Sequence, residues 1–137
     1  MLTVPGALDS LPLVHDFVAA AALSFDIPPA DAYCFQLAAE EACTNIVRHG
    51  WNGTPPADSP IDLELAADAS GWTLSICDSG RPFDPAALPP PDLTSDLAKR
   101  QPGGLGVHLI RSVMDQVRYC STGGRNCLTL VRQRSFL

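Results

Sequence analysis

The chain has 137 residues, of which 46% are hydrophobic and 18% are charged, and its formal net charge is −6. Its length and composition predict a single globular domain over residues 1–137, and its acidity argues against a nucleic-acid or anionic-membrane partner. It contains no run of 18 apolar residues, and its first residues lack the basic and apolar regions of a signal peptide, so we expect a cytoplasmic protein without a membrane span.

The first half of the chain predicts an edge strand, two helices and a loop. Residues 1–4 can form the short strand, and Asp9 or Ser10 can cap a helix that runs to about residue 25. The second helix begins near residues 29–31 and runs to about Arg48, with Gly50 as a plausible stop. The composition of residues 50–60 predicts a loop.

The second half predicts two pairs of strands separated by a long irregular segment. Apolar and polar residues alternate in 61–65 and 72–76, and strands are also predicted at 116–121 and 126–133. Residues 79–104 contain six prolines and no clear periodicity, which is typical of a functional lid or a disordered segment. A helix follows the glycines at 104 and 106. The order β-α-α-β-β-loop-α-β-β predicts an α+β fold, a mixed or antiparallel sheet with three helices on one face.

The five cysteines are odd in number and form no C-x-x-C pair. Most of them lie within apolar patterns, so we expect reduced, buried thiols, as in a cytosolic protein. They are Cys34, Cys43, Cys77, Cys120 and Cys127.

The second helix carries a polar face that could bind a ligand. Glu41 and Asn45 are four residues apart and so share one side, together with Thr44 and Arg48. An apolar arc for packing against a core lies opposite, at Phe35, Ala38, Ala39, Ala42, Cys43, Ile46 and Val47. The alternative interpretation is an ordinary solvated face.

Two glycine-containing stretches suggest nucleotide chemistry. Asp78 ends an apolar strand and Gly80 follows, so a carboxylate that accepts hydrogen bonds lies beside backbone that a flat ligand can approach. Residues 103–106 open a helix and expose backbone N–H groups that favour phosphate. An ordinary strand-to-turn Asp-x-Gly and a flexible hinge are the alternatives. The second stretch is neither a Walker nor a Rossmann motif.

Together, three strings resemble the GHKL (Bergerat-fold) ATPase/kinase superfamily. They are Leu-Ala-x-Glu-Glu-Ala-x-x-Asn-Ile-x-x-His-Gly, Asp-x-Gly-x-Pro-Phe-Asp-Pro and Gly-Leu-Gly-x-x-Leu-Ile-Arg-Ser-x-Met-Asp. The chain is most similar to the anti-sigma-factor serine/threonine-protein kinase branch (RsbW-like), over residues 8–133. The resemblance implies a two-layer α/β sandwich of the Bergerat type, with an ATP lid at about 84–103.

The resemblance also implies roles for individual residues. Asn45 would bind Mg²⁺, Glu41 would be the general base toward an acceptor hydroxyl, and Asp78 would recognise the adenine amine. Thr129 would reach the adenine through water. The remaining implied ATP-binding positions are Arg48, His49, Gly80, Phe83, Arg100, Gly103, Gly104, Leu105, Gly106 and Val107.

By resemblance, the function is that of a serine/threonine protein kinase that uses Mg²⁺ and ATP. It would phosphorylate an anti-sigma-factor antagonist of the STAS type, bind a sigma factor in partner switching, and form a homodimer whose second subunit could complete the short first strand. The alternative is a non-catalytic ATP-binding module that sequesters a partner. Related kinases often have an arginine directly before the glycine cluster, whereas here Pro102 and Gly103 precede Gly104, and the nearest cations are Lys99 and Arg100. A sensor histidine-kinase ATPase domain is a third, less favoured reading.

Overall fold

The fold is one antiparallel sheet covered on one face by helices. The computed structural model describes residues 1–49, 59–82 and 104–134. The sheet order is β1-β2-β3-β5-β4, and each neighbouring pair is antiparallel. The strands are β1 (Leu2–Pro5), β2 (Pro60–Ala67), β3 (Gly71–Asp78), β4 (Gln116–Thr122) and β5 (Arg125–Gln133).

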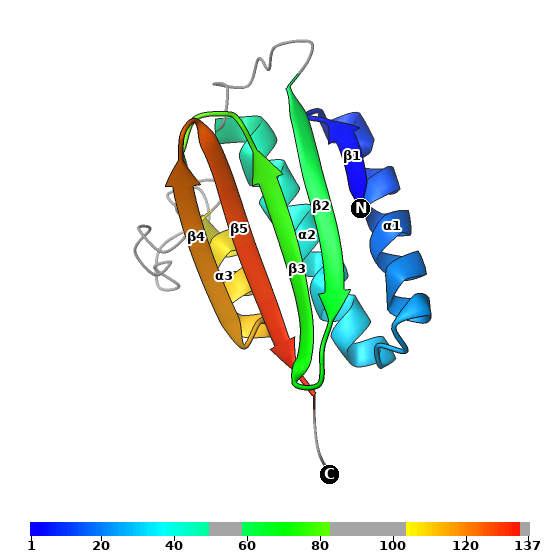
Figure 1. Ribbon diagram of the computed structural model, residues 1–137. Helices are drawn as coiled ribbons and strands as arrows, with labels where there is room; N and C mark the ends of the chain where they lie inside the picture. The colour runs from blue at the N-terminus through cyan, green and yellow to red at the C-terminus, as the bar shows by residue number, and fades with distance from the viewer. Residues whose placement is uncertain (50–58, 83–103, 135–137) are drawn as a thin grey trace.

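The helices form a single layer behind the sheet (Figure 1). They are α1 (Leu11–Ser24), α2 (Pro29–His49) and α3 (Gly104–Val113), and a short 3-10 helix (Leu8–Ser10) precedes α1. The α+β prediction with three helices on one face is therefore confirmed, and of the two predicted sheet types the antiparallel one is present.

The core lies between the two layers, and the strands show why. In β3, Trp72, Leu74 and Ile76 are buried under the helices, while the residues between them point to the face that no helix covers, which we call the open face. From α2, Phe35, Ala38 and Ala39 are fully buried in the core. The small alanines allow α2 to lie close to β3, which places its C-terminal half over the end of that strand.

Two local predictions need correction. Ser10 precedes α1, but its hydroxyl makes no cap and instead donates to the Pro5 carbonyl at 2.7 Å. The cysteines are not all reduced, because Cys77 and Cys127 form a disulfide on the open face. The antiparallel register of β3 and β5 places these two residues opposite each other across 50 residues of sequence.

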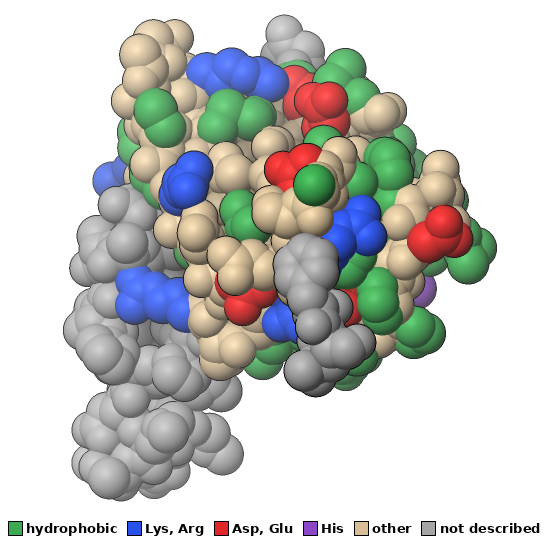
Figure 2. Space-filling model, turned by 60° about the horizontal axis from the view of Figure 1, so that its bottom comes forward, with side chains coloured by type: hydrophobic (Ala, Val, Ile, Leu, Met, Phe, Trp, Pro, Cys, Tyr) green, Lys and Arg blue, Asp and Glu red, His purple; other side chains and the backbone are tan. Residues whose placement is uncertain are grey.

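The described surface has mixed charge. Acidic and basic side chains are interspersed on the face that Figure 2 shows. Among the described residues, no helix combines the length and hydropathy that a bilayer span requires.

Candidate functional site

A pocket lies where α2, α3 and the ends of β3 and β5 converge. In Figure 1 these ends lie at the upper edge of the sheet. The pocket, together with the space at its open mouth, measures about 420 Å³. Its apolar walls come from Ala42, Ile46, Ile76, Ile110, Tyr119 and Leu128, and its polar groups come from Asn45, Asp78 and Arg81.

Asn45 is the polar group that α2 contributes. Only 4% of its surface is exposed, because it follows Ala38 and Ala42 along the stripe of α2 that faces the sheet. The sequence prediction placed it with a polar face opposite the core, but it lies at the margin of the buried stripe. An amide in this position can present an oxygen to a ligand inside the pocket.

Asp78 is the carboxylate of the pocket and is 6% exposed. Its Oδ2 accepts the backbone N–H of Gly80 at 2.9 Å and the Asn126 amide at 3.3 Å. Both of these hydrogen bonds are made to the same oxygen, so within the described part of the chain Oδ1 is the oxygen that can accept from a ligand. Burial raises the pKa of Asp78, while the Gly80 and Asn126 hydrogen bonds and the charge of Arg125 act in the lowering direction.

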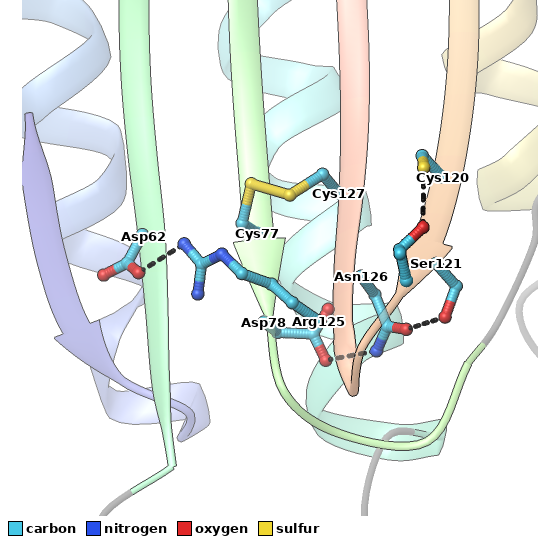
Figure 3. The surroundings of a disulfide bond; sticks show 9 residues. Asp62, Cys77, Asp78, Cys120, Ser121, Arg125, Asn126 and Cys127 are labelled. Atoms are coloured by element: carbon cyan, nitrogen blue, oxygen red, sulfur yellow. Dashed lines mark hydrogen bonds and ion pairs between the residues drawn. A yellow bond between two sulfur atoms is a disulfide. The ribbon is translucent and has the colours of Figure 1, made fainter.

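Asn126 holds this carboxylate in place and was not predicted as a site residue. It is 3% exposed, donates to the Gly80 carbonyl at 2.9 Å, and accepts the Ser121 hydroxyl at 2.6 Å. Figure 3 shows Ser121, Asn126 and Asp78 in line at this end of the sheet. The backbone of the Asp-x-Gly turn and a strand partner therefore fix one carboxylate oxygen.

The structure does not bring Thr129 to the pocket. Strand alternation puts Asn126 and Leu128 on the helix-covered face, so Thr129 points to the open face, where its cross-strand neighbours are Ser75 and Arg118. The inference from resemblance selected the wrong face of β5. The buried apolar residues Leu128 and Leu130 were the signal that could have identified Asn126 instead.

The remaining predicted site residues lie on α2, in the turn after β3, on α3, or outside the described residues. Glu41 lies one helical turn before Asn45, is partly exposed, and does not line the described part of the pocket. Arg48 is exposed. Gly80 bonds with Asp78 and Asn126, as described above. Residues 104–107 form the first turn of α3, and His49 ends α2. Phe83, Arg100 and Gly103, like the predicted lid at 84–103, lie outside the described residues.

Several pocket residues could have been found from the sequence. Arg81 lies within the quoted string after Asp78, and Ile110 is one of the apolar residues of the helix that follows the glycines. Tyr119 could not be assigned in this way, because only the pairing of β4 with β5 brings it to the pocket.

The arrangement suits a flat heterocycle that carries an amine. Aliphatic and aromatic side chains provide a slot, and a buried carboxylate with one open oxygen can accept a hydrogen bond from an exocyclic N–H. Burial also keeps the Cys43 thiol protonated near this site, because desolvation, and then the charge of Asp78, raise its pKa to about 12.

Comparison with known proteins finds a family model and several similar proteins. A family model described as a histidine kinase-like ATPase domain matches residues 4–132. The chain is 37% identical over 98 residues to the serine/threonine-protein kinase BtrW of Bordetella bronchiseptica, which covers 72% of this chain and 68% of that protein. It is 27% identical over 93 residues to the serine-protein kinase RsbW of Bacillus pumilus. This alignment covers 65% of this chain and 57% of that protein, so the chain spans just over half of its length. Among solved structures, the Acinetobacter baumannii histidine kinase AdeS aligns with a TM-score of 0.48 and 14% identity, over 97% of this chain and 68% of that chain.

Proposed function

The chain belongs to the histidine kinase-like ATPase family, in the branch that contains serine/threonine-protein kinases, and from this premise we propose that it transfers phosphate from Mg-ATP to a protein hydroxyl. The observation that carries the proposal is the buried Asp78 carboxylate, which faces an apolar pocket beside the buried Asn45 amide. This pairing supports adenine at one end of the site and phosphate chemistry at the other.

Asp78 would recognise the adenine. Because Gly80 and Asn126 occupy Oδ2, the second oxygen can accept the exocyclic amine of the ring. The pocket walls would enclose the faces of the ring, and Gly80 would let the ring edge approach the backbone. A nucleotide without this amine would present an acceptor to the carboxylate and bind less tightly.

Asn45 would hold the metal. A side-chain amide oxygen fits a hard cation such as Mg²⁺, which takes few protein ligands and keeps several waters. The bound ion would neutralise charge on the phosphates. The first turn of α3, at Gly104 and Gly106, would supply backbone N–H groups for the phosphate oxygens.

Glu41 would act on the acceptor. It is partly exposed and one turn from Asn45, so a substrate protein can approach it from outside the pocket. The acceptor oxygen would attack the γ-phosphorus, its proton would pass to the Glu41 carboxylate, and the bond to the bridging oxygen would break with ADP as the leaving group.

The partners are proposed from the family, and the homodimer also has support in the sheet. We propose that the acceptor is a serine or threonine of a STAS-type anti-sigma-factor antagonist, that a sigma factor is a second partner, and that the chain acts in the cytoplasm as a homodimer. β1 is an edge strand of four residues, and edge strands are usually protected, which supports a second copy at that edge. Sedimentation velocity at micromolar concentration should then give a dimer.

A binding module without transfer is the second candidate. The sequence feature that favours it is Pro102-Gly103 before Gly104, where related kinases often have an arginine. In that case, nucleotide would bind and a partner would be held, but no phosphate would move.

The variant pair Glu41→Gln and Glu40→Gln separates these functions. Glu40 is exposed and lies by a groove between α1 and α2, so it is a matched control on the same turn. With labelled ATP and a candidate antagonist, Glu41→Gln should lower transfer by about 10²- to 10⁴-fold and leave ATP affinity within a few-fold. Glu40→Gln should retain transfer. Unchanged transfer in Glu41→Gln would remove Glu41 as the base, and no transfer by the wild type would favour the binding module.

A further inference from the structure

Three cysteines form one row across the open face of the sheet. Cys77 on β3 lies opposite Cys127 on β5, and Cys127 in turn lies opposite Cys120 on β4. Cys77 and Cys127 are disulfide-bonded, and Cys120 is an exposed thiol (Figure 3). A free thiol is therefore the direct cross-strand neighbour of a disulfide.

The spacing allows Cys127 to bond with either neighbour. The Cα atoms of Cys77 and Cys127 are 4.2 Å apart, as in a pair without mutual backbone hydrogen bonds. The pair on the other side of Cys127 is then the hydrogen-bonded kind, with Cα atoms about 5.5 Å apart. A Cα separation of about 5.5 Å lies within the usual range for disulfides, and the Cys77–Cys127 pair already forms one. The Cys120 sulfur lies 3.4 Å from the Thr122 hydroxyl, a weak contact that does not confine it.

The order of the strands also suits exchange. A thiolate displaces a sulfur when it approaches the disulfide from the side opposite the leaving group. Because β5 lies between β3 and β4, Cys120 approaches Cys127 from the side away from Cys77. The other two free cysteines lie on α2, on the helix side of the sheet, and Cys43 is buried.

We propose that Cys77, Cys127 and Cys120 form an intramolecular thiol–disulfide exchange site. The Cys120 thiolate attacks Cys127 Sγ, an S–S bond forms between them, the Cys77–Cys127 bond breaks, and Cys77 leaves as a thiolate that takes up the proton lost by Cys120. The step is an isomerisation, so it needs no external oxidant or reductant. It moves the cross-link from the β3–β5 pair to the β5–β4 pair.

Moving the disulfide would change how firmly Asp78 is held in the pocket. Cys77 directly precedes Asp78, and Cys127 directly follows Asn126, which donates to Asp78. With the cross-link between β3 and β5, Asp78 of the pocket and its partner Asn126 are fixed relative to each other. After exchange, no disulfide links the end of β3 to β5. Nucleotide affinity would therefore depend on which disulfide is present. This consequence rests on the proposed nucleotide site, whereas the exchange itself does not.

Disulfide mapping tests the exchange directly. The folded protein is incubated without added thiol at about pH 8.5, near the ordinary pKa of a free thiol, then alkylated, digested and analysed by mass spectrometry. The wild type should give both disulfides, with alkylation shared between Cys77 and Cys120. Cys120→Ser should leave Cys77 unlabelled, and Cys34→Ser, a control on α2, should behave as the wild type. No labelled Cys77 in the wild type would overturn the proposal.

A second variant tests the reach of Cys120 independently. In Cys77→Ser, glutathione disulfide as oxidant should produce the Cys120–Cys127 disulfide, whereas persistent glutathione adducts on both residues would contradict the proposal.

ADP binding tests the coupling between the disulfide and the pocket. ADP should bind the Cys77→Ser protein with the Cys120–Cys127 disulfide roughly 2- to 10-fold more weakly than it binds Cys120→Ser, the effect of about one hydrogen bond. Equal affinities would refute the coupling to the pocket. Failure of both forms to bind ADP would refute the proposed function, while the mapping would still decide the exchange.

Discussion

The substitution Asp78→Asn tests the pocket most sharply, because it changes one atom of the recognition group. The asparagine oxygen can keep the hydrogen bonds from Gly80 and Asn126, while its NH₂ replaces the oxygen that faces the pocket. The adenine amine would then meet a donor. Losing a hydrogen bond to a charged group costs about 1.5–3 kcal/mol, so ADP affinity measured by calorimetry should fall roughly 10- to 150-fold.

The same substitution should not destabilise the fold at neutral pH. Burial raises the pKa of Asp78 above its ordinary value of 3.8, so the folded state binds this proton more tightly than the unfolded state does. The contribution of the group to stability is therefore fully present below 3.8 and is lost as pH rises through the folded pKa. The substituted amide cannot ionise, so the Tm of the variant relative to wild type should increase from about pH 4 to pH 7.

Asp62→Asn is the matched control, because it makes the same change on the open face of β2. Asp62 is paired with Arg125 at 2.8 Å and accepts the Thr3 hydroxyl at 2.7 Å, and these contacts lower its pKa. Its stabilising effect is thus present above the ordinary pKa and lost as pH falls, the opposite sign to Asp78. Asp62→Asn should leave ADP affinity unchanged. An Asp78→Asn protein that is folded and binds ADP within twofold of wild type would refute the assignment of the pocket.

Three further substitutions test the residues around this site. Asn126→Ala removes the donor to Asp78 and should weaken ADP binding in calorimetry and lower stability by about 1–3 kcal/mol in urea; unchanged values of both would contradict its role. Gly71→Ala places a Cβ against the Arg132 carbonyl and should cost about 1–3 kcal/mol in the same urea assay, with ADP affinity retained. Arg132→Ala breaks a half-buried ion pair with Asp31 at 2.6 Å and should destabilise by about 1–3 kcal/mol; a smaller loss than for an exposed arginine control would count against this.

The regular elements could be predicted because their signals are local. Alternation at Trp72, Leu74 and Ile76 identifies a strand with one buried face, and the apolar arc of the second helix identifies the side that packs. These patterns also determine that all three helices lie on one face of the sheet. The Asp78 turn could be predicted for the same reason, since its chemistry depends on two nearby residues.

The remaining features depend on register between distant segments. Cys77 and Cys127 are partners only because β3 and β5 pair in one of several possible registers, and a one-residue shift would have put them on opposite faces. Thr129 was assigned from resemblance, although the apolar residues on either side of it already indicate that it points away from the core. Asn45 was predicted to lie on the polar face of the second helix because it is four residues from Glu41, although its spacing from Ala38 and Ala42 also places it at the edge of the buried stripe.

The energetics of Asp78 help to explain why the site is built from backbone and strand neighbours. A buried carboxylate is unfavourable for the fold when ionised, and the hydrogen bonds to Oδ2 offset only part of that cost, since the net effect is a raised pKa. These donors come from a tight turn and from an asparagine that is itself held by Ser121. The open oxygen is therefore fixed in direction before a ligand arrives, so little ordering is needed on binding. A buried carboxylate whose ionised form burial disfavours, and which lines an apolar pocket, is better explained by ligand recognition than by packing.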